Sequence, residues 1–353
     1  MSDVMSHFPW LFGKPSVTGT IKNSPEDFLV DEVSDFEPAG LGEHMLVHIQ
    51  KRGENTQYVA NELAKACGVK SRDVSWAGLK DRHAVTTQWL GVHLPGKENP
   101  DLTEFVETHE GVEAVLAVTR HNKKLRPGDL AGNRFTLVLR EVSDMVELER
   151  RLQLVKEQGV PNYYGEQRFG REGNNVTQAR RWGADEIRVR DKNKRSFYLS
   201  AARSWLFNQI LAARIEAGTA ATLLQGDCLL DNEERMTVAE TVTPSLLESV
   251  SKGTLHITGA VAGDNALPGS GEAEAFEMAI LDKEPELMAL IRGNRMRQER
   301  RELLLKPQDM AWHGEGDVMT VSFSLPAGCF ATAVVRELME YTEGTPEYAH
   351  SDK

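Results

Sequence analysis

Cysteine is scarce in this sequence, and its scarcity limits the kinds of site that the chain could hold. Three cysteines, Cys67, Cys228 and Cys329, are spread over 353 residues. None stands in a CxxC pair or has a histidine at ligand spacing, so neither a disulfide framework nor a zinc site is supported. We therefore expect buried thiols in a reducing compartment and no bound metal.

Long apolar runs are also missing. No window approaches the roughly 18 consecutive uncharged apolar residues of a membrane span. The first residues show no basic stretch followed by an apolar one, as a secretion signal would. We therefore expect a cytoplasmic protein with no membrane partner. With 40% hydrophobic residues, the chain can still bury a substantial core, and its length predicts about two domains.

The net charge of −12 argues against a surface that is basic all over. Positive charges nevertheless gather in three clusters, at residues 120–126, 188–195 and 292–301. Nucleic acids bind local basic patches, whatever the total charge of the protein. An acidic chain of this kind can therefore still have an RNA partner.

The first part of the chain, from about residue 15 to residue 140, has mostly the pattern of β-strands. Apolar residues alternate with polar ones at 44–52, 88–95 and 134–141, which is typical of half-buried strands. Residues 55–68 have helical spacing, with Asn55 as N-cap and a glycine as the stop. A second helix is predicted over 144–159.

The middle of the chain, from about 160 to 306, reads as helices and loops. Helical segments are predicted at 200–218, 274–293 and 295–306, and strand alternation then returns once, at 317–326, before a helix from 331. A lone strand and helix cannot fold by themselves, so we expect this tail to join the N-terminal sheet. The prediction is a catalytic domain in two halves, 1–159 and 307–353, split by an inserted domain, 160–306.

The segment WAGLKDRHAVTTQWL, residues 76–90, places Asp81 between Lys80 and Arg82 in a loop before a strand. On spacing alone, a carboxylate that caps a turn is the more common explanation. The alternative is an acid that its cationic neighbours keep ionised, able to act as a nucleophile or a proton acceptor. The residues alone leave both interpretations open.

Seven segments in order resemble the TruD family of tRNA pseudouridine synthases and cover the chain from residue 14 to residue 340. They are KNSPEDFLVDE, GLKDRHAVTTQ, GNRFTLVLRE, VPNYYGEQRFG, KNKRSFYLSAARSWLFNQ, LPGSG and LPAGCFATAVVREL. The resemblance implies an α/β fold of the α+β kind, with a mainly antiparallel or mixed sheet in a catalytic domain of pseudouridine-synthase type and a more helical inserted domain.

The resemblance also implies a reaction, in which a uridine of tRNA becomes pseudouridine without a cofactor. The family's usual target is position 13, in the D arm, and we expect the protein to act as a monomer. Asp81 matches the family's catalytic aspartate by its place in GLKDRHA. Family analogy favours Lys22 as its cationic partner, although Lys80, Arg82 and Arg336 are also candidates.

Phe28, Asn133, Phe135 and Phe330 match the family's substrate-contacting residues. An enzyme that acts on a base in folded RNA must extrude the base and stack it on apolar groups. By pattern alone, Phe28 and Phe135 would more often be core residues, and Asn133 a turn residue. The amide of Asn133 can nevertheless match the donor and the acceptor of a uracil edge.

Two other functions fit the same residues. A glycoside or N-glycoside hydrolase also places a carboxylate at the anomeric carbon, and Glu26, Asp27 or Asp31 could supply the second acid that it needs. In an RNA-binding protein without catalysis, Asp81 would be a structural cap. Free uracil as product would indicate hydrolysis, whereas an Asp81→Ala variant with unchanged function would indicate a binder.

Overall fold

The computed structural model describes residues 3–344, which divide into two compact units. Of the described residues, the first unit contains 3–15, 153–306 and 332–338, and the second contains 16–152, 307–331 and 339–344. Each unit therefore draws on distant parts of the chain. Within residues 3–344 no helix has the length and apolar character required to cross a membrane.

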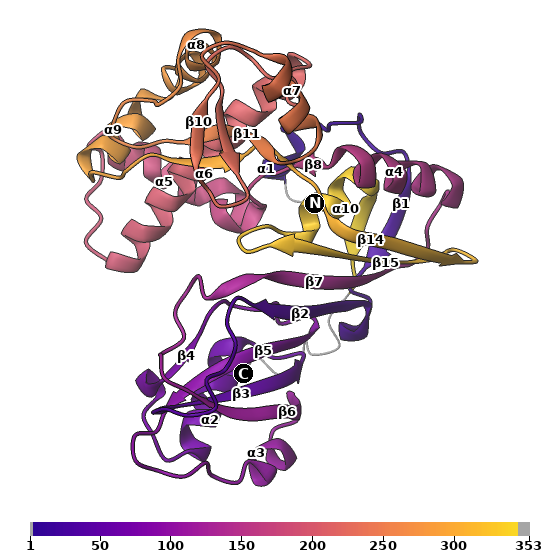
Figure 1. Cartoon of the computed structure of the whole chain (residues 1–353), viewed down its shortest axis with the longest axis vertical. Coiled ribbons are helices and arrows are strands. Elements are labelled where there is room, and N and C mark those ends of the chain that lie inside the picture. The colour runs from indigo at the N-terminus through magenta and orange to yellow at the C-terminus, as the bar shows by residue number, and fades with distance from the viewer. Residues whose placement is uncertain (1–2, 345–353) are drawn as a thin grey trace. The chain divides into compact units, whose positions relative to one another are not determined.

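The second unit is built on an eight-stranded sheet in the order β14-β15-β7-β2-β5-β3-β6, with β4 paired to β5 (Figure 1). Among these strand pairs only β2 and β5 run in parallel, so the sheet is mainly antiparallel, as predicted. The strands are β2 (Phe28–Ser34), β3 (His44–Arg52), β4 (Val74–Trp76), β5 (Val85–His93), β6 (Val112–His121), β7 (Leu130–Leu139), β14 (Gln308–Glu315) and β15 (Val318–Pro326). The pairing of β15 with β7 confirms that the tail strand joins the N-terminal sheet.

One face of this sheet packs against helix α2 (Thr56–Ala66). Period-two alternation places Met45, Val47 and Ile49 of β3 on that face, where they join a buried cluster with Val59 and Leu63 of the helix. The side chain of Asn55 caps α2 by accepting from the main-chain N–H of Tyr58, at 2.7 Å. The predicted strand and helix are therefore both present, and each buries its apolar face against the other.

Shorter elements complete the second unit. Strand β1 (Thr18–Ile21) pairs in parallel with β16 (Glu340–Glu343), and α3 (Thr103–Thr108) precedes β6. Short 3-10 helices lie at η1 (Pro25–Asp27) and η2 (Ser71–Asp73). Helix α4 (Met145–Gln158) begins in the second unit and ends in the first.

The first unit has a four-stranded antiparallel sheet in the order β10-β9-β11-β12 and a larger share of helix. Its core surrounds helix α6, whose Leu206, Phe207 and Ile210 are fully buried. The strands are β8 (Val160–Pro161), β9 (Cys228–Asp231), β10 (Met236–Val238), β11 (Leu255–Val261), β12 (Glu299–Glu302) and β13 (Leu304–Leu305). The helices are α1 (Asp3–Ser6), η3 (Glu166–Phe169), η4 (Arg171–Gly173), α5 (Asn174–Gly183), α6 (Lys192–Glu216), α7 (Pro244–Ser251), α8 (Gly271–Leu281), α9 (Pro285–Gly293) and most of α10 (Ala331–Leu338).

Three element predictions in this unit were wrong. Helix α6 begins at Lys192 and not at residue 200, because Asp191 caps it by accepting from Lys194 N at 2.8 Å. The helix predicted over 274–293 is two helices, since Pro285 starts a new one. The stretch 295–306 forms strands β12 and β13, because tertiary pairing with β11 and β8 overrides its helical composition.

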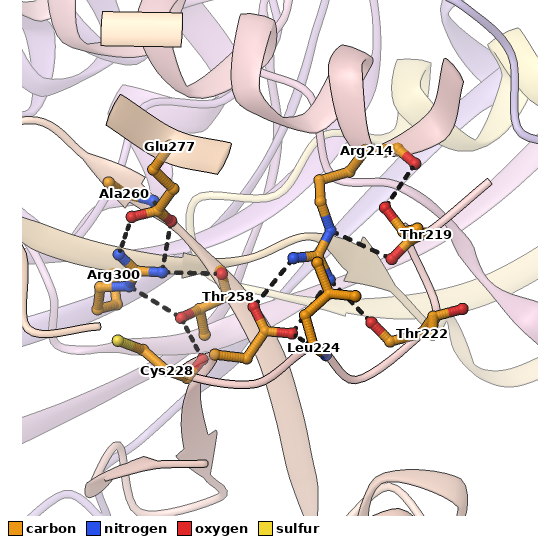
Figure 2. Close-up of polar contacts among 10 residues, drawn as sticks. Arg214, Thr219, Thr222, Leu224, Cys228, Thr258, Ala260, Glu277 and Arg300 are labelled. Carbon is orange, nitrogen blue, oxygen red and sulfur yellow. Dashed lines mark hydrogen bonds and ion pairs between the residues drawn. The ribbon is translucent and has the colours of Figure 1, made fainter. Parts of the chain in front are cut away.

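Two buried ion pairs link elements of this unit, one between a helix and a strand and one between a helix and the residue before β9 (Figure 2). Arg300 of β12 donates to both carboxylate oxygens of Glu277 of α8, at 2.7 and 2.9 Å, and to Thr258 of β11. Arg214 of α6 pairs in the same forked way with Asp227, at 3.0 and 3.1 Å. Within each pair, the arginine and the carboxylate satisfy each other's hydrogen bonds in the interior. The loss of one partner would therefore leave the charge of the other uncompensated.

Candidate active site

Asp81 lies in the loop between β4 and β5, and buried side chains hold the main chain of this loop. Gln88 donates to the carbonyl oxygen of Gly78 at 3.2 Å, and the main-chain N–H of Lys80 donates to the hydroxyl of Thr56 at 3.1 Å. Thr56 in turn donates to Gln88 at 2.8 Å. The core of the second unit therefore sets the path of residues 78–80.

The carboxylate of Asp81 faces solvent on one side and a lysine on the other. Its side chain is 40% exposed, and its Oδ1 lies 3.9 Å from Nζ of Lys22, whose side chain is only 10% exposed. The same ammonium lies 3.8 Å from Glu343. Lys22 directly follows β1 with a left-handed backbone, φ 54°. The carboxylate is therefore accessible and has a cation beside it.

The three other candidate cations have different partners. Lys80 forms a buried ion pair with Glu32 at 2.9 Å. Arg82 lies 3.6 Å from Glu54. Arg336 belongs to the first unit, where it donates to main-chain carbonyl oxygens near the N-terminus. Although Lys80 and Arg82 flank the aspartate in sequence, the ion pairs of their side chains are with other acids.

Aromatic rings lie beside Lys22. Its Nζ is 4.4 Å from the ring centroid of Phe28, a cation–π distance. The ring of Phe28 meets Phe135 edge to face at 6.2 Å, and Phe135 contacts Phe323 at 5.5 Å. Phe28 is 2% exposed and Phe135 5% exposed, so both rings lie mainly in the core. They form a rigid apolar support next to the ammonium.

Asn133 has an unused hydrogen-bonding atom. Its Oδ1 is buried and has no hydrogen-bond partner among the described residues. In the sheet it stands opposite Glu32 on β2 and Leu325 on β15. The preceding Gly132 approaches β15 so closely that a Cβ there would collide with the carbonyl oxygen of Leu325. A buried oxygen without a partner is costly, and this one is available to accept a hydrogen bond.

Phe330 is partly buried in the short segment between the turn after β15 and helix α10. Within residues 3–344 no ring contact joins it to Phe28 or Phe135. The structure thus brings together Asp81, Lys22 and Phe28 by direct contacts, while Phe330 occupies a separate loop of the same unit.

Lys51, which was not among the predicted site residues, directly contacts the Asp81 loop. Its Nζ donates to the carbonyl oxygens of Glu54, at 2.6 Å, and of Asp81, at 2.9 Å. The residue is 1% exposed, and burial lowers its pKa to about 8. The alternation of β3 could have shown it, because Lys51 follows Val47 and Ile49 on the core face.

The arginines of the first two basic clusters have different surroundings. In the first cluster, Arg120 holds neighbouring loops by donating to Leu94 O at 3.1 Å and Asn99 at 2.7 Å. The second cluster borders a cavity of about 720 Å³ in the first unit, whose lining includes Trp182, Asp185, Arg188, Arg190, Arg195 and Asn294. This cavity combines an aromatic ring with several guanidinium groups, which suits a nucleotide better than an apolar ligand. Among the described residues, no group of three His, Cys, Asp or Glu side chains is arranged to hold a metal ion.

The chain matches known proteins along nearly all of its length. The family model described as tRNA pseudouridine synthase D (TruD) matches residues 6–179 and 183–338. A tRNA pseudouridine synthase D from Photobacterium profundum is 60% identical over 346 residues, 98% of each chain. One from Aliivibrio fischeri is 55% identical over 352 residues, 100% of each chain.

The fold has a counterpart among solved structures. The crystal structure of the putative TruD protein from Methanosarcina mazei superposes with a TM-score of 0.72, covering 96% of this chain and 97% of that one. The identity is 22%, so this likeness concerns the fold. It agrees with the mixed α/β architecture of both units.

Proposed function

This chain belongs to the TruD family of tRNA pseudouridine synthases, and we propose that it isomerises uridine 13, in the D arm of tRNA, with Asp81 as the reacting carboxylate. The observation that carries the proposal is the geometry of Asp81. Its side chain is 40% exposed and 3.9 Å from Lys22, in a loop whose main chain is held by Thr56, Gln88 and Lys51.

The reaction makes demands that these residues meet. The bond between N1 of uracil and C1′ of ribose breaks, the base turns, and C5 bonds to C1′; C5 then loses its proton and N1 gains one. No atom is gained or lost overall and the oxidation state does not change, so the reaction consumes no co-substrate. An accessible carboxylate can attack C1′, add to the base or remove a sugar proton. Lys22 places a positive charge 3.9 Å from this carboxylate.

The detached uracil needs a place where it can turn without escaping. We assign Phe28 and Phe135 as the apolar support of that place and Phe330 as a ring that contacts the base. Asn133 supports the assignment through its buried Oδ1, which has no partner in the described chain and can accept from N3–H of uracil. Lys22, packed on Phe28, would keep the ring and the carboxylate together.

The wider setting of the enzyme is part of the proposal. Residues 1–159 and 307–353 would form the catalytic domain in two halves, and 160–306 the inserted domain. The arginines that line the Trp182 cavity support the proposal that the inserted domain binds tRNA. We also propose that the protein works as a monomer in the cytoplasm.

The decisive test is an Asp81→Asn variant, which keeps the shape of the side chain and removes its charge. We expect pseudouridine formation on unmodified tRNA to fall on the order of 10²–10⁴-fold, while tRNA binding is retained. Product is measured by mapping pseudouridine along the tRNA, and binding by titration.

The matched control is Asp35→Asn, which changes an exposed acid of the same unit and should leave turnover unchanged. Turnover of Asp81→Asn near the wild-type rate would overturn the role of the aspartate. Release of free uracil by the wild type would point to hydrolysis. Pseudouridine at a position other than 13 would refute only the choice of target.

A further inference from the structure

Lys51 stands where a charged residue is costly. It lies on the core face of β3 at 1% exposure, among the largest fully buried side chains of the chain. Transfer of an ammonium group from water to a protein interior is unfavourable even after the surroundings relax. An unbranched apolar side chain such as methionine would fill most of the space without this cost, so packing does not account for the amine.

The amine of Lys51 joins two loops. It donates to the carbonyl oxygen of Glu54, in the β3–α2 loop, and to that of Asp81, in the β4–β5 loop. Two further hydrogen bonds link the same loops, from Gly53 N to Ala84 O at 3.2 Å and from Arg82 Nε to Gly53 O at 3.4 Å, and Arg82 also pairs with Glu54 at 3.6 Å. The bond from Lys51 is the one that reaches the main chain of the aspartate itself.

The other side chains that bond the main chain of the β4–β5 loop do so before the aspartate. Gln88 holds the carbonyl of Gly78, and Thr56 holds the N–H of Lys80. Without the Lys51 bond, the peptide after Asp81 could rotate, and rotation would displace the carboxylate. A displacement of about 1 Å can cost a reaction roughly 10²-fold.

We propose that Lys51 is a positioning residue, which fixes the Asp81 carbonyl from inside the core and thereby aims the Asp81 carboxylate at the nucleoside. The inference rests on the proposed role of Asp81, because Lys51 acts through that residue and touches no substrate. The position of a reactive group on a loop is thus fixed as closely as that of a group on a strand.

The test is Lys51→Met, which keeps an unbranched side chain one atom shorter than lysine and removes the donor. We expect turnover of tRNA to fall about 10-fold to 100-fold at saturating substrate, with the dissociation constant for tRNA within about twofold of wild type. The unfolding temperature should stay equal or rise, because a buried charge is gone. A purely structural lysine would show the opposite combination, namely a lower unfolding temperature and normal turnover of the folded protein.

Two companion variants make each outcome decisive. Met45→Ala, on the same face of β3, should lower the unfolding temperature yet leave turnover unchanged while the protein is folded. Lys51→Gln, which retains an N–H donor on a shorter side chain, replaces Lys51→Met if the latter does not fold, and its turnover should also be reduced.

Asp81→Asn is measured beside them. If Asp81→Asn is inactive while the Lys51 variant turns over within about twofold of wild type, Lys51 does not position the aspartate. If Asp81→Asn remains active, the proposed catalytic role of Asp81 fails. A slow Lys51 variant would then mean that Lys51 affects turnover in some way other than by positioning Asp81.

Discussion

At the scale of single residues, the loop of Asp81 combines an exposed acid with buried support. The carboxylate meets solvent and Lys22, whereas the main chain on either side is bonded to Thr56, Gln88 and Lys51. Hydrogen bonds from buried groups are seldom broken by water. The aspartate can therefore be accessible without being mobile.

Lys51 should make the stability of the folded protein depend measurably on pH. Its pKa is lowered to about 8, chiefly by burial; Asp81 and Glu54 favour the ammonium, and Lys80 opposes it. In the unfolded chain the pKa of a lysine is about 10.4. Below about pH 8 both states are protonated, and the folded state bears the full cost of the buried charge. Between these values the unfolded state binds more protons, so this group makes the protein more stable as pH rises.

We expect the unfolding free energy of wild type, relative to Lys51→Met, to increase by about 2–3 kcal/mol between about pH 7 and pH 10. Urea unfolding of the two proteins at both pH values measures the difference, and the many groups that they share cancel. A difference that stays constant with pH would mean that Lys51 keeps its ordinary titration in the folded state.

At the scale of elements, the first unit depends on polar pairs where its sheet meets its helices. Glu277 of α8 accepts from Arg300 of β12 and also from the main-chain N–H of Ala260 of β11, at 3.0 Å (Figure 2). Its carboxylate therefore ties one helix to two strands. Because both side chains of the ion pair are less than 10% exposed, water cannot replace the missing partner.

A Glu277→Gln variant should lose about 3–5 kcal/mol of stability, since it leaves the Arg300 guanidinium buried without its counter-charge. Urea unfolding followed by the fluorescence of the tryptophans measures the loss. The control is Glu248→Gln on α7, whose pair with Lys252 is exposed on both sides and should change stability by less than about 1 kcal/mol. Equal effects of the two variants would show that the buried pair is not a support of this unit.

For the molecule as a whole, the net negative charge opposes the binding of tRNA, which is itself negatively charged. The net charge is −12, so attraction to tRNA has to come from local groups. Arg188 and Arg190 border the Trp182 cavity, and the described chain shows no ion pair for either. Free guanidinium groups beside an aromatic ring are suited to phosphate and base contacts.

Replacement of Arg188 and Arg190 by glutamine should weaken tRNA binding about tenfold or more and reduce the slope of log K against log salt by roughly 1–2. Turnover at saturating tRNA should be unchanged. Arg181→Gln is the matched control, because this exposed arginine pairs with Glu186 and does not line the cavity. A double variant with the wild-type salt slope would exclude these arginines from the contact.

Features that depend on neighbours along the chain were predictable before the fold was known. Alternation predicted β3, β5, β7 and β15, the Asn55 cap predicted α2, and seven motifs in order, one of them around Asp81, indicated the family. These features are local, because strand faces, helix caps and motifs are set by residues a few positions apart.

Which distant groups meet could be seen only in the folded chain. Four cations were candidates for Asp81 until folding placed Lys22 beside it and paired Lys80 with Glu32. Residues 295–306 contain strands because the edges of β11 and β8 were available to pair with them. Lys51 became a buried donor because the loops of Glu54 and Asp81 supply the carbonyl oxygens that accept from it. In each case the free energy of a contact between remote residues outweighed the local preference, and that contact exists only once the chain has folded.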